Sequence, residues 1–254
     1  MPDIIRTDII RTEALKKSYA NGRPVLDNID LRIGTGERIA LIGSNGTGKS
    51  TLLKCLIGHT SFCSGEVVTL GETFHASPSK TQLQRIRQRM GFVFQSHGLV
   101  RRQSVLTNVV HGKLGLAGGW RAWHQAIARQ EFREQAMEAL EQVNLTAKAK
   151  ARADELSGGQ AQRVAIARAL IRQPALMIAD EPAASLDPTA GRDVMEVFSE
   201  LVRKNGITLV FTTHDMDHAI SFADRIIALK AGRIHFDLPA GAVSRSEIDG
   251  VFNA

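Results

Sequence analysis

A glycine-rich segment with a single lysine carries the most specific chemistry in this sequence. Residues 43–50 read Gly-Ser-Asn-Gly-Thr-Gly-Lys-Ser, which matches the phosphate-binding pattern G-x-x-x-x-G-K-[ST]. Glycines suit this task because backbone N–H groups must converge on phosphate oxygens, and a Cβ would obstruct them. In such a loop Lys49 neutralises charge on the β- and γ-phosphates, and Ser50 gives its hydroxyl oxygen to Mg²⁺. The predicted nucleotide contacts are Gly43, Ser44, Asn45, Gly46, Thr47, Gly48, Lys49, Ser50 and Thr51.

A pair of neighbouring carboxylates follows another apolar segment. Residues 176–179 are apolar, and Asp180 and Glu181 come directly after them. Ligands bind at the edge of a sheet where parallel strands end. Asp180 suits the Mg²⁺ shell, and Glu181 suits a general base or orienting group for a water that attacks the γ-phosphate. An isolated pair of acids usually marks a solvated turn, but the preceding apolar run and the glycine-rich loop favour a site.

These side chains need strands and helices to hold them. Short β-branched segments alternate with helical patterns in ERIALIG and STLLKCLIG, in ALMIADEP and VMEVFSELVRK, and in ITLVFTTH and MDHAISFADRIIALK. This alternation, with near-continuous apolar strands, predicts an α/β core with a parallel sheet covered on both faces. The glycine-rich loop then lies between a strand and a helix that begins near Ser50, whose N-terminus adds its positive dipole end.

Residues 96–165 read differently from the rest of the chain. They lack convincing strands, and their apolar residues recur at helical spacing at Phe132, Ala136, Leu140 and Val143. We expect a helical insertion between two strands of the core; the alternative is a long surface excursion. After it, Asp187 is predicted to cap a helix that starts at Pro188, and Asn205-Gly206 to end that helix.

Length and composition limit the classes that remain. The 254 residues correspond to one or two domains, and 43% hydrophobic residues are enough for a sizeable core. The net charge of +6 favours anionic partners without choosing among them. Cys55 and Cys63 form neither a disulfide framework nor a zinc ribbon, which suits a reducing compartment. No apolar run approaches the roughly 20 residues that cross a bilayer, and acids occupy the start of the chain, so we expect no unaided transport.

The pentapeptide Leu-Ser-Gly-Gly-Gln at residues 156–160 resembles the signature of ATP-binding-cassette (ABC) ATPases. It stands at the family's position, after the helical insertion and before the strand that carries Asp180. The resemblance implies a single domain over 1–254: a P-loop NTPase core at 1–95 and 166–254 with a parallel sheet and an N-terminal antiparallel β subdomain, and a helical subdomain at 96–165. Physically, a serine and two glycines at a helix start form a second anion-binding N-terminus. The implied nucleotide contacts here are Ser157, Gly158, Gly159 and Gln160.

The resemblance also implies roles for four single residues. Tyr19, the chain's only tyrosine, looks like the aromatic that stacks on adenine. Gln95 resembles the glutamine that touches Mg²⁺ or the attacking water. Asp187 ends a loop, Ala-Ser-Leu-Asp, that in the family crosses to the partner subunit. His214 matches the histidine that senses the γ-phosphate and holds the water.

The family's assembly follows by the same resemblance. Two copies pair head to tail on ATP, so that the loop at Lys49 in one copy and Ser157 in the other enclose one nucleotide. Bound γ-phosphate closes the dimer, and its hydrolysis lets the dimer open. The movement is passed to two membrane-spanning permease subunits, which work with a periplasmic or extracellular solute-binding protein. The implied place is the cytoplasmic face of the inner membrane, as a peripheral subunit.

The stretch HGLVRRQSVLTNVVHGKLG after Gln95, with GLAGGWRAWHQ behind it, looks like the phosphonate-import members of the family. A cassette of a polar amino-acid importer is the alternative within transporters. Outside them, the chain would serve a phosphonate-degrading or nucleic-acid-associated complex. Lys148, Lys150 and Arg152 would be the evidence for nucleic acid, but without interleaved aromatic residues they favour a solvated helix end, and we expect no nucleic-acid partner.

Overall fold

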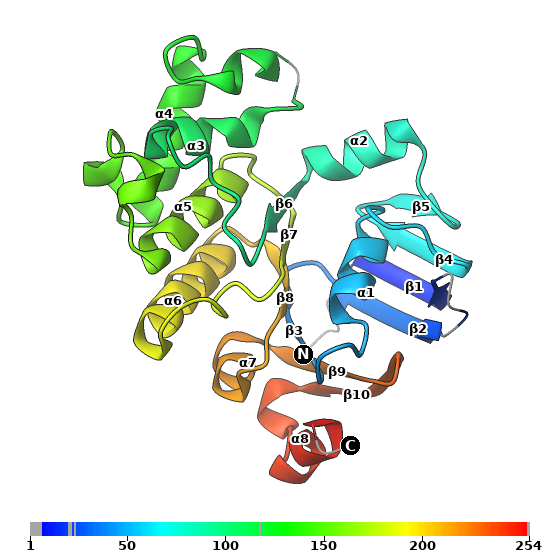
Figure 1. Ribbon diagram of the computed structural model, residues 1–254. Helices are drawn as coiled ribbons and strands as arrows, with labels where there is room; N and C mark the ends of the chain where they lie inside the picture. Colours follow the sequence, from blue (N-terminus) through cyan, green and yellow to red (C-terminus); the bar gives the residue numbers. More distant parts are fainter. Residues whose placement is uncertain (1–6, 20–21, 23, 117, 253–254) are drawn as a thin grey trace. The chain divides into compact units, whose positions relative to one another are not determined.

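The computed structural model describes residues 7–19, 22, 24–116 and 118–252. The chain forms two compact units, one of Met1–Arg87 with Gly206–Ala254 and one of Gln88–Asn205 (Figure 1). Within the described residues, the structure contains no helix that is both long and apolar enough to span a bilayer.

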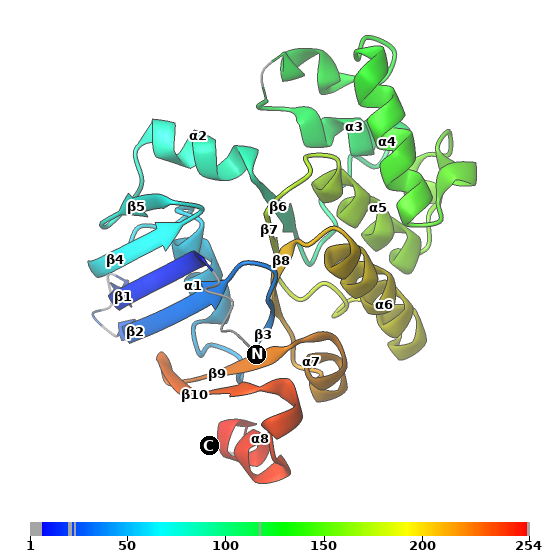
Figure 2. The same cartoon turned by 180° about the vertical axis from the view of Figure 1, so that it is seen from behind.

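The first unit contains an antiparallel sheet near the N-terminus. Its strands run in the order β2-β1-β4-β5. They comprise Asp8–Ser18 (β1), Pro24–Gly34 (β2), Ser64–Thr69 (β4) and Glu72–Phe74 (β5). In β2, buried Leu26, Ile29, Leu31 and Ile33 lie among more exposed residues, as a sheet with one covered face requires. Figure 2 shows these strands side by side. The predicted antiparallel subdomain is confirmed.

The first unit also contains parallel strands. Strand β3 (Arg38–Ile42) pairs in parallel with β8 (Thr208–Thr212) and with β9 (Arg225–Lys230). Strand β10 (Arg233–Pro239) pairs antiparallel with β9. All five residues of β8 and the last four of β3 are buried, which is typical of parallel strands covered on both faces. The predicted α/β class is therefore confirmed.

The helices of the first unit are mostly short. They are Lys49–Leu56 (α1), Lys80–Gln88 (α2), which reaches the unit boundary, Met216–Phe222 (α7), the 3-10 turn Ala240–Ala242 (η5) and Arg245–Phe252 (α8). Helix α1 is fixed to the antiparallel sheet at its last residue. The buried Thr69 hydroxyl of β4 donates a hydrogen bond to the carbonyl of Leu56 at 2.6 Å. The sheet thus sets the direction of α1.

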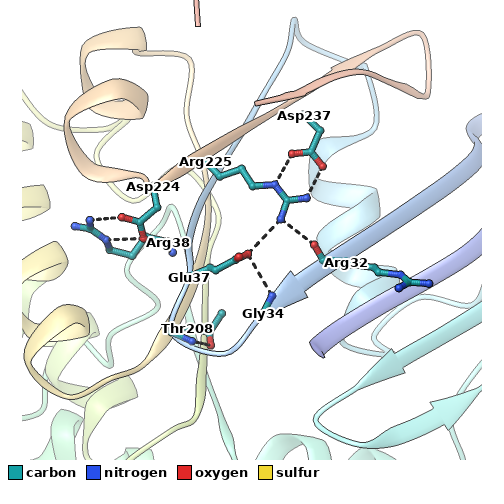
Figure 3. Close-up of polar contacts among 9 residues, drawn as sticks. Arg32, Gly34, Glu37, Arg38, Thr208, Asp224, Arg225 and Asp237 are labelled. Carbon is teal, nitrogen blue, oxygen red and sulfur yellow. Dashed lines mark hydrogen bonds and ion pairs between the residues drawn. The ribbon is translucent and has the colours of Figure 1, made fainter. Parts of the chain in front are cut away.

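An ionic network ties the start of β3 to β2, β9 and β10 (Figure 3). Arg225 binds both carboxylate oxygens of Asp237 and donates to the Arg32 carbonyl at 3.0 Å and to Glu37 at 3.2 Å. Glu37 in turn accepts the backbone N–H of Gly34 at 3.2 Å. These partners raise the pKa of Arg225, chiefly through its hydrogen bonds with Asp237, against a smaller opposing effect of burial. The network holds in register the strand that leads into the glycine-rich loop.

The second unit is mainly helical. Its two strands, Met90–Val93 (β6) and Leu176–Ala179 (β7), pair in parallel. Its α-helices are Val105–Val110 (α3), Gln130–Gln142 (α4), Gly158–Leu170 (α5) and Pro188–Lys204 (α6). Shorter 3-10 helices are His111–Lys113 (η1), Gly119–Trp123 (η2), Thr146–Lys148 (η3) and Ala153–Glu155 (η4). Within the described part of residues 96–165, β-pairing is limited to an isolated bridge between Ser104 and Arg152. The predicted helical insertion is thus helical, while its boundaries stay a prediction.

Helix α5 is the centre of the second unit. It contacts α3, α4, α6 and β6, and it is apolar around most of its circumference, as such a buried helix must be. Two arginines, Arg168 in α5 and Arg172 just after its end, hold neighbouring loops through backbone carbonyls. Arg168 binds those of His97 and Gly98, both at 2.6 Å, and Arg172 binds those of Gly112 and Leu114, both at 2.5 Å.

Local signals at helix α6 act as the sequence predicts. The Asp187 carboxylate accepts the N–H of Ala190 at 3.0 Å, Pro188 is the first helical residue, and the helix ends at Lys204 with Asn205 as its C-cap. The predicted cap, start and stop are confirmed.

Candidate nucleotide-binding site

The glycine-rich loop lies between the end of β3 and the start of α1. Its glycines adopt positive φ angles, 146° at Gly43, 80° at Gly46 and 105° at Gly48. A Cβ on Gly43 would lie 2.3 Å from the Leu229 carbonyl oxygen of β9. One on Gly48 would lie 2.7 Å from the Val25 carbonyl oxygen of β2. Both the backbone angle and the close neighbours therefore require glycine at residues 43 and 48.

Lys49 bends back over this loop. Its ammonium donates hydrogen bonds to the carbonyl oxygens of Gly43 at 2.7 Å and Ser44 at 3.0 Å, and its side chain is buried. Thr47 donates to the same Ser44 carbonyl at 2.9 Å. The lysine charge is thus held at the centre of the loop, where an anion enclosed by the loop meets it. Ser50 and Thr51 are partly exposed in the first turn of α1.

The parallel pairing of β3 with β8 places His214 at the same edge as the loop. Leu41 is the register partner of Thr212, and the N–H of Thr213 donates to the Leu41 carbonyl at 3.4 Å. The glycine-rich loop starts at residue 43, directly after β3, and His214 follows β8 with an exposed side chain. Two predicted site elements far apart in sequence therefore leave the first unit at one sheet edge.

The second unit brings another pair of predicted elements together. Val93 of β6 is the register partner of Ala179 of β7, and the N–H of Asp180 donates to the Val93 carbonyl at 3.0 Å. Gln95 and the two carboxylates thus follow neighbouring strand ends, with Gln95 exposed and both acids partly exposed. Glu181 has a φ of 49°, an unfavourable conformation for a residue with a side chain and one that occurs at functional sites.

The Leu-Ser-Gly-Gly-Gln segment forms the N-terminus of α5. The hydroxyl of Ser157 accepts the N–H of Gln160 at 3.3 Å, and the Gln160 side chain accepts the N–H of Ser157 at 3.1 Å. This reciprocal capping box leaves Ser157 and Gly158 exposed at the helix tip. A Cβ on Gly158 would lie 2.9 Å from the Leu186 side chain, so the loop before Asp187 passes close to the helix tip.

Tyr19 lies after β1 and is 49% exposed, with the ammonium of Lys17 4.8 Å from its ring centroid. The ring therefore presents a face to solvent beside a cation. The half-exposed ring is accessible to a planar ligand.

Sequence reasoning missed several positioning contacts because they join distant residues. The Ser44 hydroxyl donates to the Val251 carbonyl of α8 at 3.3 Å. Lys230 donates to the carbonyl of Gly250 in the same helix at 2.6 Å. Arg168 likewise donates to the carbonyls of His97 and Gly98. In each, a backbone carbonyl is the acceptor, and no residue type in the sequence marks its position.

Comparison with known proteins identifies the family. A model of the ABC transporter family matches residues 26–184. The phosphonates import ATP-binding protein PhnC of Stutzerimonas stutzeri is 44% identical over 250 residues, which cover 96% of this chain and 90% of the relative. PhnC 1 of Rhodopseudomonas palustris strain BisB18 is 41% identical over 244 residues, covering 96% and 89%.

Solved structures agree. The cbiO1 protein from Clostridium perfringens, part of the ABC transporter complex cbiONQ, superimposes with a TM-score of 0.82 at 29% identity and covers 95% of this chain and 92% of its own. The dimeric ATP-binding cassette MJ0796 bound to ADP and Pi gives 0.77 at 33% identity, covering 91% and 98%. The order of motifs, the two sheets and these matches lead to one conclusion: the chain belongs to the ABC transporter family.

Proposed function

We propose that this chain is the ATP-hydrolysing subunit of an ABC importer that takes up phosphonates or a related phosphorus oxyanion. The observation that carries the proposal is the 44% identity to a phosphonates import ATP-binding protein across nearly the full length of both chains. The relatives' names thus support both the ATPase role and the cargo.

The glycine-rich loop binds the triphosphate. Its amides and the N-terminus of α1 face the phosphate oxygens, and the buried Lys49 ammonium exchanges its carbonyl partners for β- and γ-phosphate oxygens. Because Gly43 and Gly48 already have the required backbone angles, little conformational entropy is lost on binding. Tyr19 stacks on the adenine ring.

Hydrolysis requires a water aligned with the γ-phosphorus. Glu181 accepts a proton from that water or orients it, while His214 and Gln95 hold it through their polar side chains. The water oxygen forms a bond to phosphorus as the bond to the β-phosphate bridging oxygen breaks. Each of these three residues follows a strand end, so its backbone is anchored while its side chain remains accessible.

The donor set fits a magnesium ion. The proposed ligands are Ser50, Gln95 and Asp180, whose hydroxyl, amide and carboxylate oxygens are the ligand type that Mg²⁺ prefers. All three side chains are at least partly exposed, which leaves room for the phosphate oxygens and waters that complete such a shell. The ion, when bound with ATP, neutralises charge on the β- and γ-phosphates.

The functional assembly is a head-to-tail dimer of this chain on ATP. The tip of α5 supports this, because Ser157, Gly158 and Gly159 form a helix N-terminus whose serine is exposed and whose capping box fixes its shape. Such a tip attracts the γ-phosphate held by the partner copy, with Gln160 as its brace. The Leu186 side chain lies close to Gly158 at this tip, and the loop that ends at Asp187 is proposed to reach the partner copy. The dimeric structure of the similar MJ0796 cassette supports dimerisation.

The remaining partners follow from the importer assignment. Two membrane-spanning permease subunits receive the closing movement, and a solute-binding protein delivers the cargo outside the membrane. The chain then acts at the cytoplasmic face of the membrane as a peripheral subunit. Nucleic acid is not among the proposed partners. The division into a core at 1–95 and 166–254 and a helical subdomain at 96–165 is part of this proposal.

A deletion strain that lacks any redundant importer tests the cargo. We expect it to lose growth on methylphosphonate or aminoethylphosphonate as sole phosphorus source, and to recover with the wild-type gene but not with a Lys49→Ala variant. Normal growth of the deletion strain would reject phosphonate uptake. Loss of polar amino-acid uptake instead would favour the amino-acid importer. Co-purification with lyase subunits or RNA, without permeases, would reject a transport role.

A further inference from the structure

Two exposed tryptophans, Trp120 and Trp123, lie in the 3-10 helix η2, between α3 and α4 in the sequence. Trp120 and Trp123 are 75% and 70% exposed, and nearby Ile127 is 48% exposed. We refer to these three residues as the tryptophan patch. Clusters of large exposed apolar residues mark interaction surfaces. The nucleotide chemistry proposed above uses none of them.

The patch is held outward by the geometry of the 3-10 helix η2. A 3-10 helix has three residues per turn, so residues three apart in sequence lie on the same side. Trp120 and Trp123 therefore share one face, while Gly119 and Ala122, both buried, share another. A Cβ on Gly119 would lie 2.1 Å from the Lys113 carbonyl oxygen, so this inner face sits tightly against η1. Because the face with Gly119 and Ala122 is packed against η1, the opposite face with the two indoles is held toward solvent.

Additional contacts stabilise this arrangement. The Nε2 of His111 in η1 lies 2.8 Å from the Trp123 carbonyl oxygen. The centroids of the His111 imidazole and the Trp123 indole are 6.1 Å apart. Arg121 donates to the Ile127 carbonyl at 3.1 Å, which closes the loop that carries Ile127. The patch is thus a built feature of the unit, with defined backbone partners on both sides.

Two arginines, Arg121 and Arg129, lie beside the patch. The Arg121 guanidinium lies 5.9 Å from the centre of the Trp120 ring, and the Arg129 guanidinium lies so close to Gly118 that a Cβ there would be 2.7 Å from it. Residues 88–130 contain six Lys or Arg and no Asp or Glu; acidic residues begin at Glu131 in α4. The ligand that meets this surface is therefore anionic at its edge and apolar at its centre.

A phospholipid surface has both properties. Indole rings concentrate at the membrane interface, where an apolar ring and an N–H donor are both satisfied, and arginines bind lipid phosphates. We propose that the tryptophan patch inserts into the headgroup region of an anionic phospholipid bilayer, with Arg121 and Arg129 on the lipid phosphates. This contact is separate from nucleotide binding and from any permease subunit, and it does not depend on the proposed cargo.

The full chain itself supplies the probe, because Trp120 and Trp123 are its only tryptophans. Indole emission is measured as the protein is titrated with vesicles of phosphatidylglycerol and phosphatidylcholine, and with phosphatidylcholine alone. We expect a blue shift and co-sedimentation with the anionic vesicles, weakened by salt, and quenching by lipids brominated on the upper acyl chain. Quenching uses the wild-type protein, so it remains informative even if a variant misfolds.

Variants test which residues carry the binding. Replacing both tryptophans, Trp120→Ser with Trp123→Ser, should lower the vesicle partition coefficient at least about tenfold. Arg129→Gln should lower it about fivefold. Ile220→Ser is the matched control, because Ile220 is also exposed, at 43%, but lies on α7 in the first unit; it should bind like the wild type. ATPase activity in solution should be unchanged in all three variants.

Three results would overturn the proposal. The first is a wild-type protein that binds neither kind of vesicle. The second is a double tryptophan variant that binds anionic vesicles as well as the wild type. The third is an emission shift that appears with solubilised permease or with RNA but not with protein-free vesicles, which would make the patch a docking surface for that macromolecule. None of these results would alter the ATPase assignment, which rests on other residues.

Discussion

Ser44 in the phosphate loop and Val251 in the C-terminal helix α8 are joined by a hydrogen bond, 3.3 Å from the serine hydroxyl to the valine carbonyl. The two residues are 207 positions apart. Val251 is almost completely buried, and Lys230 binds the preceding carbonyl, of Gly250, at 2.6 Å. Helix α8 is therefore attached to the loop that binds phosphate, and its stability and that of the loop are linked.

Ser44→Ala should lower the free energy of unfolding by about 1 kcal/mol, because it removes the donor from a carbonyl in a buried residue. Urea denaturation monitored by circular dichroism measures this change. Ser61→Ala, at an exposed position between α1 and β4, is the control and should cost less. If Ser44→Ala is as stable as the wild type, the hydrogen bond to Val251 contributes nothing.

Lys49→Ala and Glu181→Gln should separate binding from turnover. The first removes the buried ammonium of the phosphate loop and should weaken ATP affinity at least about tenfold, since a charge-assisted contact to phosphate is lost. The second should leave affinity within about twofold and lower kcat about a hundredfold or more, trapping the closed dimer. Equilibrium nucleotide binding, steady-state hydrolysis and size-exclusion chromatography with ATP measure the three effects. Equal hydrolysis rates for Glu181→Gln and wild type would contradict the role of Glu181.

Ser157→Asp should distinguish a structural cap from an anion-binding one. Aspartate caps a helix about as well as serine, so stability should change by less than about 0.5 kcal/mol. Its negative charge, however, would repel a γ-phosphate presented by the partner copy, and ATP-dependent dimerisation and hydrolysis should be lost. Ser157→Arg should also abolish hydrolysis, and it should in addition lower the free energy of unfolding, because the N-cap of α5 is lost. Binding of nucleotide to the monomer stays near normal in both. Hydrolysis at the wild-type rate in Ser157→Asp would show that the site is not shared between copies.

Arg168→Lys should destabilise the protein by about 1–3 kcal/mol. The fork of Arg168 donates to the carbonyls of His97 and Gly98 at once, and a lysine ammonium does not reproduce that geometry. Burial lowers the pKa of the Arg168 guanidinium. The exposed Arg192, which pairs with Glu196 one helical turn away, provides the control in Arg192→Lys. Thermal unfolding of both variants checks the difference; equal melting temperatures would reject it.

The two cysteines should react differently with iodoacetamide. Burial raises the pKa of the Cys55 thiol from 9.0 to about 11, whereas Cys63 is exposed. At pH 8 the folded protein should therefore take up one adduct, at Cys63, and the urea-unfolded chain two. The folded state holds the Cys55 proton more tightly than the unfolded chain does. The protonated Cys55 thiol therefore contributes its full share to the free energy of unfolding below about pH 9, and this share is lost as the pH rises toward 11. Intact-protein mass spectrometry, with Cys63→Ser as control, reports the adducts. Two adducts formed at equal rates in native buffer would contradict this account.

Local signals explain why so much of the fold was predictable. The cap at Asp187, the capping box at Ser157 and the glycines of the phosphate loop each depend on residues within a few positions of one another. Parallel strands were recognisable because burial on both faces demands a continuous apolar run. Gln95, His214 and Tyr19 were predicted as site residues only through the family's order of motifs, since a single polar residue after a strand carries no distinctive local pattern.

The sequence by itself determined the class of ligand, the order of the elements and the ends of the main helices, because phosphate loops, caps and apolar periodicity are short-range properties. The tertiary structure alone decided which strand ends lie side by side, that α8 holds Ser44, that Arg168 clamps a loop 70 residues earlier in the chain, and that two tryptophans face outward. These relationships join residues far apart in sequence, often through backbone carbonyls that every residue possesses. These contacts form only when the chain folds and buries its apolar surface, because folding determines which distant polar groups come close enough to hydrogen-bond.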